Sequence, residues 1–290
     1  KYGDLSLKVV LKWNFDTSIT SALPEGEVPY TGYDKQTTKG GTLTTKISQE
    51  VRSMHESGSF SLGSSDQEGH TTIRRESKHF YRFVRGGDDA MNSIRIFNNK
   101  KVDELLLVDI TATKRNCSIN PDFVERVADE CYMPFGVGGG IRTTDQIKKL
   151  IRAGAEKVNI NSGAFAKPQL IRAASEIFGC QSIVVGIDYR RDLFGRMKVF
   201  THCGNKKTKR DPITWAQEAE SLGAGEILLT CIDRDGVQEG YDLETLSKIT
   251  ASVSIPVIAS GGAGKTQHFQ EAFAKDAYAV AAGSMFVFKG

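Results

Sequence analysis

The chain contains the stretch Met133-Pro134-Phe135-Gly136-Val137-Gly138-Gly139-Gly140-Ile141-Arg142, and later a copy of it, Ile255-Pro256-Val257-Ile258-Ala259-Ser260-Gly261-Gly262-Ala263-Gly264. The prolines of the two copies are 122 residues apart (256 − 134 = 122). Two further pairs of segments match at the same spacing, 103–107 with 225–229 and 161–165 with 283–287. Three matches at one spacing predict a duplicated half, each copy containing a strand, a glycine turn, a helix and a strand.

Both glycine turns follow a short apolar strand and precede a helical pattern. Glycine at such a place lets backbone N–H groups approach an anion closely and point at it. A single glycine turn often does no more than reverse the chain. Two turns that are related by an internal repeat predict two phosphate sites, one in each half.

The composition of the chain limits its class. Its 290 residues carry a formal net charge of +3, and 39% of them are hydrophobic. This is enough for one large domain, and the charge is too small to indicate a nucleic-acid partner. The sequence shows no apolar run of membrane-spanning length and no signal sequence, so we expect a cytoplasmic protein without membrane contact. The five scattered cysteines and five histidines show no metal-ligand spacing, so we expect no protein-held metal.

Residues 1–88 differ in composition and in hydrophobic pattern from the rest of the chain. They are rich in Ser, Thr and Gly, and only residues 5–13 read clearly as a strand. Residues 46–55 suggest a short helix, and residues 57–70 an exposed or disordered loop. We therefore separate an atypical N-terminal segment, 1–88, which supplies a first strand or is partly disordered, from a regular domain, 89–290.

Strands alternate with helices from residue 89 onward. Continuous apolar runs predict strands buried on both faces of a parallel sheet, at residues 104–109, 135–138, 157–161, 183–188, 226–231, 257–260 and 279–282. Periodic apolar positions, caps and glycine stops predict helices between them, at residues 90–98, 120–129, 144–153, 168–178, 212–222, 243–251 and 267–274. Residues 189–210 form an insertion, in which residues 197–201 suggest a small hairpin.

This alternation is typical of open doubly wound sheets and of closed (β/α)8 barrels. Two equivalent halves can close on each other around an axis, so the repeat favours an α/β fold of the (β/α)8 TIM barrel type, built from two half-barrels. Seven strands are predicted from residue 104 onward, and closure needs an eighth. Residues 5–13 are the best candidate for this first strand, and no helix is identified after the last strand.

The active site of such a barrel lies at the C-terminal ends of its strands. Asp188 follows the apolar run 183–187, and a partly desolvated carboxylate there is suited to proton transfer. Capping a helix or fixing a loop is the ordinary alternative, and Asp109 invites the same two interpretations. Asp233 and Asp235 are suited equally to a turn and to positioning a ligand. The other strand-end residues are Gly138, Gly139, Gly140, Asn161, Ser162, Thr230, Ser260, Gly261, Gly262, Gly283 and Ser284.

Three charged residues begin strands at the opposite end. Glu104, Lys157 and Glu226 would meet at the N-terminal mouth of a barrel. Such charges usually form a solvated rim. Because they converge from three strands, they also suit an ion-pair ring that closes a central passage.

Several motifs resemble those of one known family. They are 103–105 with 109–112, 137–142, 157–161, 186–188, 223–230, Asp233-Arg234-Asp235-Gly236 with Gly240-Tyr241-Asp242, and 258–265. From about residue 89 to residue 290, the chain resembles the cyclase subunit of imidazole glycerol phosphate synthase in histidine biosynthesis (the HisF family), together with its close paralogues.

The resemblance implies a reaction and a partner. Ammonia from a glutaminase subunit, docked as a heterodimer, splits and cyclises a bisphosphorylated aminoimidazole-carboxamide ribonucleotide, which gives imidazole glycerol phosphate and a carboxamide ribotide. The resemblance implies no cofactor, because positioning and proton transfer carry the chemistry.

The resemblance also implies roles for individual residues. Asp188 matches a catalytic acid–base residue of the family, and Glu104, Lys157 and Glu226 match members of the charged gate through which ammonia enters. We further expect Asp109, Thr230 and Asp235 to position the substrate. The family's phosphate contacts match Gly140, Asn161 and Ser162 at one end of the substrate, and Gly236, Gly262, Gly283 and Ser284 at the other.

One feature of the family is left unassigned in this chain. Its second catalytic aspartate, at the end of strand 1, would fall on residues 63–70, which are neither apolar nor strand-like. Asp66 has no strand before it, and Asp16 lies too far upstream. We therefore assign no second catalytic acid and no basic gate residue from strand 1.

Three alternatives stay open. Residues 282–290 and Ile96-Phe97-Asn98 look more like the paralogues that partner an amidotransferase in surface-sugar amidination, and those paralogues lack the strand-1 acid. The phosphoribosyl isomerase with the same halves works alone, so the charged trio disfavours it. An alternative of another class is a non-catalytic ammonia conduit or scaffold.

Overall fold

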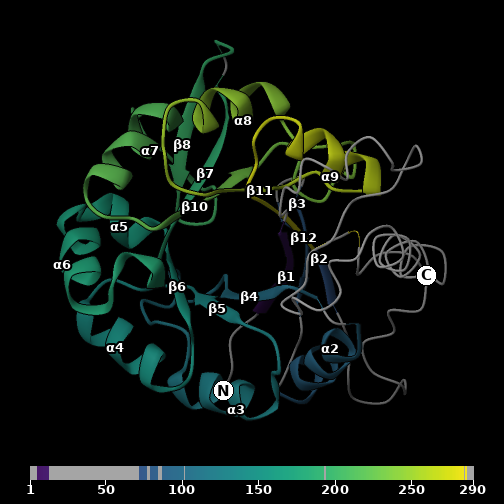
Figure 1. Cartoon of the computed structure of the whole chain (residues 1–290), viewed down its shortest axis with the longest axis vertical. Helices are drawn as coiled ribbons and strands as arrows, with labels where there is room; N and C mark the ends of the chain where they lie inside the picture. The colour runs from purple at the N-terminus through teal and green to yellow at the C-terminus, as the bar shows by residue number, and fades with distance from the viewer. Residues whose placement is uncertain are drawn as a thin grey trace, which may run out of the picture.

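A ring of strands surrounded by helices forms the body of the molecule (Figure 1). We describe it from a computed structural model, in which residues 5–12, 72–76, 79–83, 87–100, 102–192, 194–283 and 285 are described. In ring order the strands are β10 (Glu226–Cys231), β11 (Val257–Ser260), β12 (Ala279–Ala282), β1 (Leu5–Lys12), β4 (Glu104–Asp109), β5 (Phe135–Gly138), β6 (Lys157–Ile160) and β7 (Ile183–Arg191). Since β7 also pairs with β10, the ring closes, and the predicted barrel is confirmed.

Helices cover the outside of the ring. They are α2 (Gly87–Lys100), α3 (Pro121–Glu130), α4 (Thr144–Arg152), α5 (Ser162–Ala166), α6 (Gln169–Phe178), α7 (Pro212–Ser221), α8 (Leu243–Thr250) and α9 (Thr266–Phe273), with a short 3-10 turn at Cys180–Ser182. All the helices predicted from residue 90 onward are present, and α5 was not predicted. None of the helices in the described part of the chain has both the length and the apolar composition needed to cross a membrane.

Two helix starts show how local sequence sets these boundaries. Asn120 caps α3 by accepting the N–H of Asp122, and Pro121 occupies the first turn, where its missing N–H costs no hydrogen bond. Asp211 caps α7 in the same way, ahead of Pro212. Both helices therefore begin where the capping pattern predicted.

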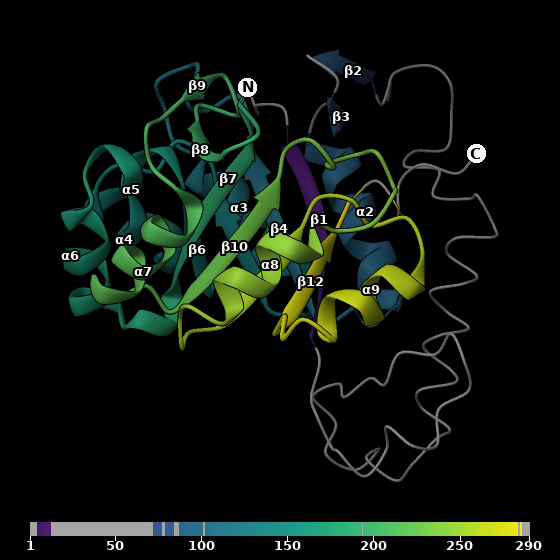
Figure 2. The ribbon, with the colours of Figure 1, turned by 90° about the horizontal axis from the view of Figure 1, so that it is seen from above.

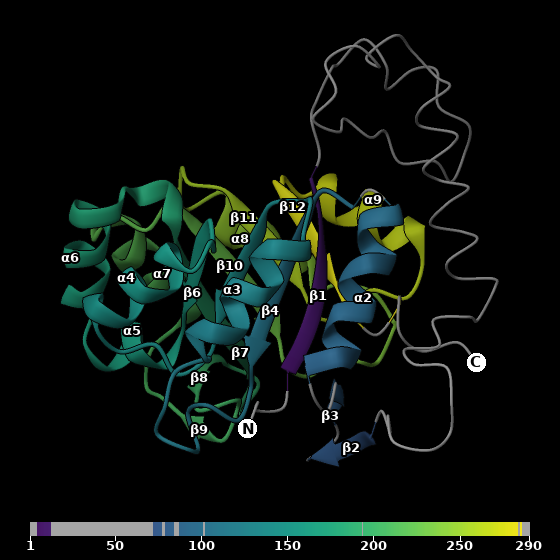
Figure 3. The same cartoon turned by 90° about the horizontal axis from the view of Figure 1, so that it is seen from below.

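The first strand runs in the opposite direction to its neighbours. β1 pairs antiparallel with β4 on one side and with β12 on the other, and Figure 3 shows it lying between them. The prediction that residues 5–13 supply the missing strand is confirmed, but a (β/α)8 barrel would have this strand parallel. Period-two alternation fixes which face of a strand is buried, and it reads the same in either direction. The sequence pattern therefore could not show this reversal.

Two further features lie outside the regular alternation. The insertion after Asp188 extends β7 to Arg191 and continues into β8 (Met197–Thr201) and β9 (Lys206–Lys207), which pair antiparallel. A separate two-stranded sheet joins β2 (Thr72–Glu76) and β3 (His79–Phe83). The predicted helix at 46–55, the predicted loop at 57–70 and the region 63–70 lie outside the described residues.

Each of the parallel barrel strands presents alternate side chains to the lumen and to the helices. Leu106, Val184, Leu228, Ile258, Ala279 and Ala281 form a small apolar cluster inside the ring. Their sequence neighbours, such as Leu105, Leu107 and Val185, point outward into the large core shared with the helices. The parity of a position along its strand therefore decides whether its side chain faces the lumen of the barrel or the helices.

The predicted repeat is present in three dimensions. β4 and β10, β5 and β11, β6 and β12, and α4 and α9 each begin at positions with the 122-residue spacing. Equivalent backbone bonds are also shared: Leu105 N–H donates to the carbonyl of Pro134 at 3.0 Å, and Ile227 N–H to that of Pro256 at 2.9 Å. The two halves therefore have the same local fold.

The two glycine turns pack closely against the loops beside them. Gly140 and Gly262 have φ angles of +66° and +122°, which L-residues rarely adopt. A Cβ atom on Gly262 would overlap the carbonyl oxygen of Gly240, and one on Gly140 would overlap that of Cys117. Because β5 and β11 run in the same direction, both turns lie at the same end of the barrel.

This packing predicts a large difference between two glycine substitutions. Gly195, in the insertion, also has a positive φ of +75°, but a Cβ there would meet no atom within 4 Å. Gly195→Ala should therefore lower the free energy of unfolding only by the strain of a left-handed backbone conformation, about 1–2 kcal/mol. Gly262→Ala adds a clash with backbone and should cost roughly 3 kcal/mol or more. Urea unfolding of the two variants measures the difference, and equal costs would show that the turn has room to relax.

Candidate functional site

The C-terminal ends of the parallel strands open at one end of the barrel, which we call the mouth. Figures 2 and 3 show β8 and β9 beyond this end. The loops that follow β4, β5, β6, β7, β10, β11 and β12 all lie there, because these strands run in one direction. Most of the strand-end residues singled out in the sequence are therefore brought to one face of the molecule.

Asp188 lies at the mouth on the lumen side of β7. It has the same parity as Val184, which belongs to the lumen cluster, and as Gly186, whose missing Cβ would lie 2.8 Å from Asn159 Oδ1. In ring order β7 is two strands from β5 and two strands from β11, the strands that carry the glycine turns. The Asp188 carboxyl group therefore lies between the two turns.

A row of small polar side chains continues from Asp188 around the mouth. Asp188 is in register with Thr230 on β10, and Thr230 with Ser260 on β11. Thr230 and Ser260 lie on the same side of their strands as the lumen residues Leu228 and Ile258, and both are buried. Hydroxyl groups next to a carboxyl group can donate to it or to a ligand above it. Thr230 is thus placed to contact whatever Asp188 contacts.

Asp109 is turned away from the lumen. Its carboxylate accepts from Thr111 N–H (2.9 Å), Thr111 Oγ1 (2.8 Å) and Ala112 N–H (3.0 Å), and it forms an ion pair with Arg115 at 2.6 Å. It shares the parity of Leu105 and Leu107, which face the helices. These contacts fix the loop after β4. A role in positioning a substrate stays a prediction for Asp109, and the geometry favours an indirect one.

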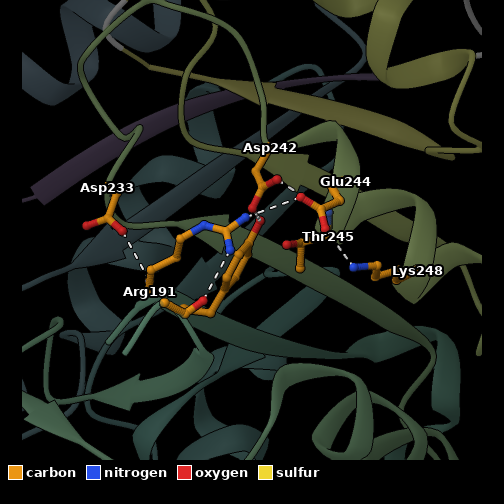
Figure 4. A network of polar contacts seen from close by, with 8 residues as sticks. Arg191, Asp233, Asp242, Glu244, Thr245 and Lys248 are labelled. Carbon is orange, nitrogen blue, oxygen red and sulfur yellow. Dashed lines mark hydrogen bonds and ion pairs between the residues drawn. The ribbon is translucent and has the colours of Figure 1, made fainter. Parts of the chain in front are cut away.

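A polar network anchors the end of β7 to the neighbouring loop and helix (Figure 4). Tyr189 Oη donates to Asp242 Oδ2 at 3.2 Å, and Asp242 Oδ1 caps α8 by accepting the N–H of Thr245. Burial, and then the nearby Cys231 and Asp242, raise the pKa of Tyr189 well above its usual value, so the phenol stays a donor. Tyr189 directly follows Asp188, so the network holds the strand end that carries this carboxyl group.

Arg191 extends the same network to the surface. Its N–H donates to Asp233 Oδ2 at 3.2 Å, and its guanidinium pairs with Glu244 at 3.3 Å, which also pairs with Lys248. Asp233 thus ties the loop after β10 to the insertion after β7. Of the two interpretations of Asp233, the contacts favour a structural one.

Asp235 lies beside the second glycine turn. A Cβ on Gly261 would be 3.4 Å from the Cβ of Asp235, and the Asp235 N–H donates to Cys231 O at 3.0 Å. Burial, followed by the Asp235 charge, raises the pKa of Tyr241, whose hydroxyl donates to Ala281 O at 3.2 Å. Asp235 therefore borders the same turn as Gly262, and its role in positioning a substrate stays a prediction.

The turn between β8 and β9 reaches across the mouth, which the sequence did not predict. The N–H of His202 donates to Ser162 Oγ at 2.9 Å, and Cys203 Sγ donates to Ile110 O at 3.0 Å. A Cβ on Gly204 would lie 3.4 Å from the side chain of Ile232. Since these partners follow β6, β4 and β10, the insertion contacts three separate loops of the mouth. Its length was the one signal that could have indicated this.

The candidate phosphate residues fall into two groups. Gly140 and Ser162 belong to neighbouring loops, which pack so closely that a Cβ on Gly163 would overlap the carbonyl of Ile141; Asn161 immediately precedes α5. Gly236 and Gly262 belong to loops that also meet, since the Gly240 N–H donates to Gly262 O at 2.8 Å. Gly283 directly follows β12, and Ser284 lies outside the described residues.

The three charges at the opposite end of the barrel form a largely buried ion-pair cluster. Lys157 Nζ lies 3.0 Å from Glu104 Oε2 and 2.7 Å from Glu226 Oε1. The prediction that these residues converge is confirmed, and they are too buried to be a solvated rim. Within the described residues, Glu226 Oε2 and Asn159 Oδ1 are buried without a hydrogen-bond partner. Both residues are in register with Val184, from opposite sides, so the two free acceptors face the same lumen.

The described part of the chain shows no gathering of three His, Cys, Asp or Glu side chains that could hold a metal ion. Its five cysteines are free thiols. Burial raises the pKa of Cys231 to about 11, so this thiol stays protonated.

Comparison with known proteins agrees with this geometry. The family model described as "Histidine biosynthesis protein" matches residues 73–290. The chain is 46% identical over 208 residues to the imidazole glycerol phosphate synthase subunit HisF of Streptomyces avermitilis, which covers 72% of this chain and 83% of the relative. It is also 46% identical over 206 residues to the subunit HisF of Endomicrobium trichonymphae (71% and 79%).

A third relative is the putative imidazole glycerol phosphate synthase subunit hisF2 of Pseudomonas aeruginosa, 46% identical over 203 residues, which covers 70% of this chain and 81% of the relative. The family match begins at residue 73, inside the segment that composition set apart as 1–88. With three quarters of the chain matched and a barrel of the expected kind, the chain belongs to the histidine biosynthesis protein family, as a HisF-type subunit of imidazole glycerol phosphate synthase, a lyase.

Proposed function

We propose that this HisF-type subunit performs its cyclase reaction at the mouth of the barrel, with Asp188 as the acid–base residue between two phosphate sites. The observation that carries this proposal is the position of β7, midway in ring order between the strands of the two glycine turns. A substrate with a phosphate at each end would span the mouth from one turn to the other. Its reacting centre would then lie above Asp188.

Each phosphate site has donors of the kind that bind anions. Glycines at positive φ expose successive backbone N–H groups, which point at an anion without a side chain in the way. We assign Gly140, Asn161 and Ser162 to one phosphate, and Gly236, Gly262, Gly283 and Ser284 to the other. Thr230, Asp235 and the loop fixed by Asp109 would position the part of the substrate between them.

Asp188 is suited to proton transfer by its surroundings. It lies at the boundary between an apolar lumen and the open mouth, next to the hydroxyl of Thr230 in register. The network through Tyr189 and Arg191 holds its strand end in place. A fixed carboxyl group of this kind can remove a proton from one atom of the substrate and return it to another without a cofactor.

We propose that ammonia enters at the other end of the barrel from a docked glutaminase subunit. The Lys157 ion pairs close the lumen there, and the unpartnered acceptors Glu226 Oε2 and Asn159 Oδ1 lie along the way to the mouth. A small hydrogen-bond donor in the lumen would find a partner at each of them. The name of the relatives, a synthase subunit, fits a heterodimer of this kind.

Replacing the acid–base residue tests the first part of this proposal. Asp188→Asn should lower kcat with ammonium salt and the bisphosphorylated ribonucleotide at least about 100-fold, because the amide cannot transfer the proton. KM should change little, since the phosphate sites are untouched. Asp129→Asn, on the exposed face of α3, is the matched control and should keep full activity.

A near-normal kcat for Asp188→Asn would remove this residue from the mechanism. Wild-type protein that fails to turn over this substrate with ammonium salt would instead favour a sugar-amidating paralogue or a non-catalytic conduit.

Replacing the central cation tests the proposed entry route. Lys157→Ala should lower glutamine-dependent activity, measured with the glutaminase partner, more than activity with added ammonium salt, because only the first uses the passage. Both rates come from one preparation, so any loss of folded protein lowers them equally and leaves their ratio unchanged. Removing Lys157 takes the cation away from two neighbouring carboxylates, Glu104 and Glu226, and should also cost about 3–5 kcal/mol of stability. An unchanged ratio would make the ion-pair cluster purely structural.

A further inference from the structure

We infer that His268 is a positioning residue that holds the second glycine turn in its phosphate-binding shape by accepting the N–H of Gly264. The inference rests on the proposed function, because it concerns one of the two phosphate sites assigned above. His268 itself lies outside the assigned phosphate residues. Its titration would make the phosphate site of the second half-barrel depend on pH in a way that the site of the first half-barrel does not.

The contact itself is direct and buried. The Gly264 N–H donates to Nδ1 of His268 at 3.1 Å, and the side chain of His268 is only 7% exposed. Because Nδ1 accepts this bond, it carries no proton, and the neutral imidazole has its N–H at Nε2. His268 is in the first turn of α9, four residues after the end of the glycine turn.

The first half of the barrel makes the same contact with a different side chain. Subtracting the 122-residue spacing of the repeat from 268 and 264 gives 146 and 142. There the Arg142 N–H donates to Oε1 of Gln146 at 2.7 Å. A side chain in the first turn of the following helix therefore holds the glycine turn in both halves, and the duplication has kept the contact while the residue type changed.

The imidazole also touches the second loop of its phosphate site. The missing Cβ of Gly240 would lie 3.5–3.7 Å from the ring of His268, and the Gly240 N–H donates to Gly262 O. A Cβ on Gly264 would overlap the carbonyl of Gln238. His268 thus contacts both the loop that follows Gly236 and the turn that contains Gly262 and Gly264.

The two halves differ in one chemical property. The amide of Gln146 does not titrate, whereas a proton on Nδ1 of His268 turns the acceptor into a donor and breaks the bond to Gly264. Burial lowers the pKa of His268; Glu271 on α9 opposes this shift, and Lys265 and Arg234 add to it. The neutral form is therefore favoured in the folded protein, and its contribution is complete above the unfolded pKa and is lost as the pH falls.

Two variants of the intact protein test this inference, with KM for the bisphosphorylated ribonucleotide and Kd for inorganic phosphate measured from about pH 5.5 to pH 8. His268→Ala should raise KM about ten-fold, the effect of losing one bond to a buried donor, with kcat little changed. His268→Gln should restore KM, because Gln146 makes this contact at the equivalent place. Binding of the ribonucleotide and of phosphate by His268→Gln should also weaken less at acid pH than binding by the wild-type protein. Titration of the ligand itself is common to both proteins and cancels in the comparison.

Gln146→Ala is the matched control in the first half. It should raise KM while keeping the acid weakening of the wild type, since His268 is intact. Unchanged KM and Kd in His268→Ala, or the same acid weakening in His268→Gln as in wild type, overturns the inference. Wild-type protein that binds neither the ribonucleotide nor phosphate overturns the proposed function instead, so the two failures are distinguishable. Thermal unfolding of each variant separates a loosened turn from a protein that does not fold.

Discussion

The barrel depends on the backbone hydrogen bonds that β1 makes with β4 on one side and with β12 on the other. Without β1, the edges of β4 and β12 would leave a row of N–H and C=O groups unpaired in a largely apolar interior, and each buried unpaired group costs about 1–3 kcal/mol. β1 pairs with both edges and closes the ring. Closure fixes the circumference, and with it the distance across the mouth between the two glycine turns. An antiparallel strand meets this requirement as well as a parallel one.

Closure also sorts the lumen by depth. On the parallel strands, positions of one parity face inward. Along the barrel axis these positions carry first charged side chains, then apolar ones, and then small polar groups and a carboxyl group at the mouth. Three glycines on the inner face, at 136, 138 and 186, leave space that Leu106 and the Asn159 side chain approach. The same alternation that builds the outer core thus supplies a lumen with different chemistry at its two ends.

Much of this was predictable, and the failures have physical causes. The repeat predicted six of the strands and both glycine turns, because equal spacing constrains both copies at once, and a continuous apolar run predicted β7. α5 is too short for helical periodicity to appear, and alternation cannot show the direction of β1. Asp109 is more instructive. Once Glu104 was predicted to face the lumen, parity already placed residue 109, five positions later, on the other face. The orientation of Asp109 could therefore have been predicted from the alternation along its strand, which the argument from strand ends did not use.

The duplicated halves have diverged where one copy is enough. The position equivalent to Asp109 in the second half is Cys231, a buried protonated thiol, so the loop after β10 is fixed by other contacts, among them Asp233 with Arg191. Both glycine turns were kept, as the two proposed phosphate sites require. The strand that would mirror β7 is replaced by the reversed β1, so the first half presents no described counterpart of Asp188. In the function proposed above, both halves thus contribute to binding, while the proposed proton-transfer group, Asp188, belongs among the described residues to the second half.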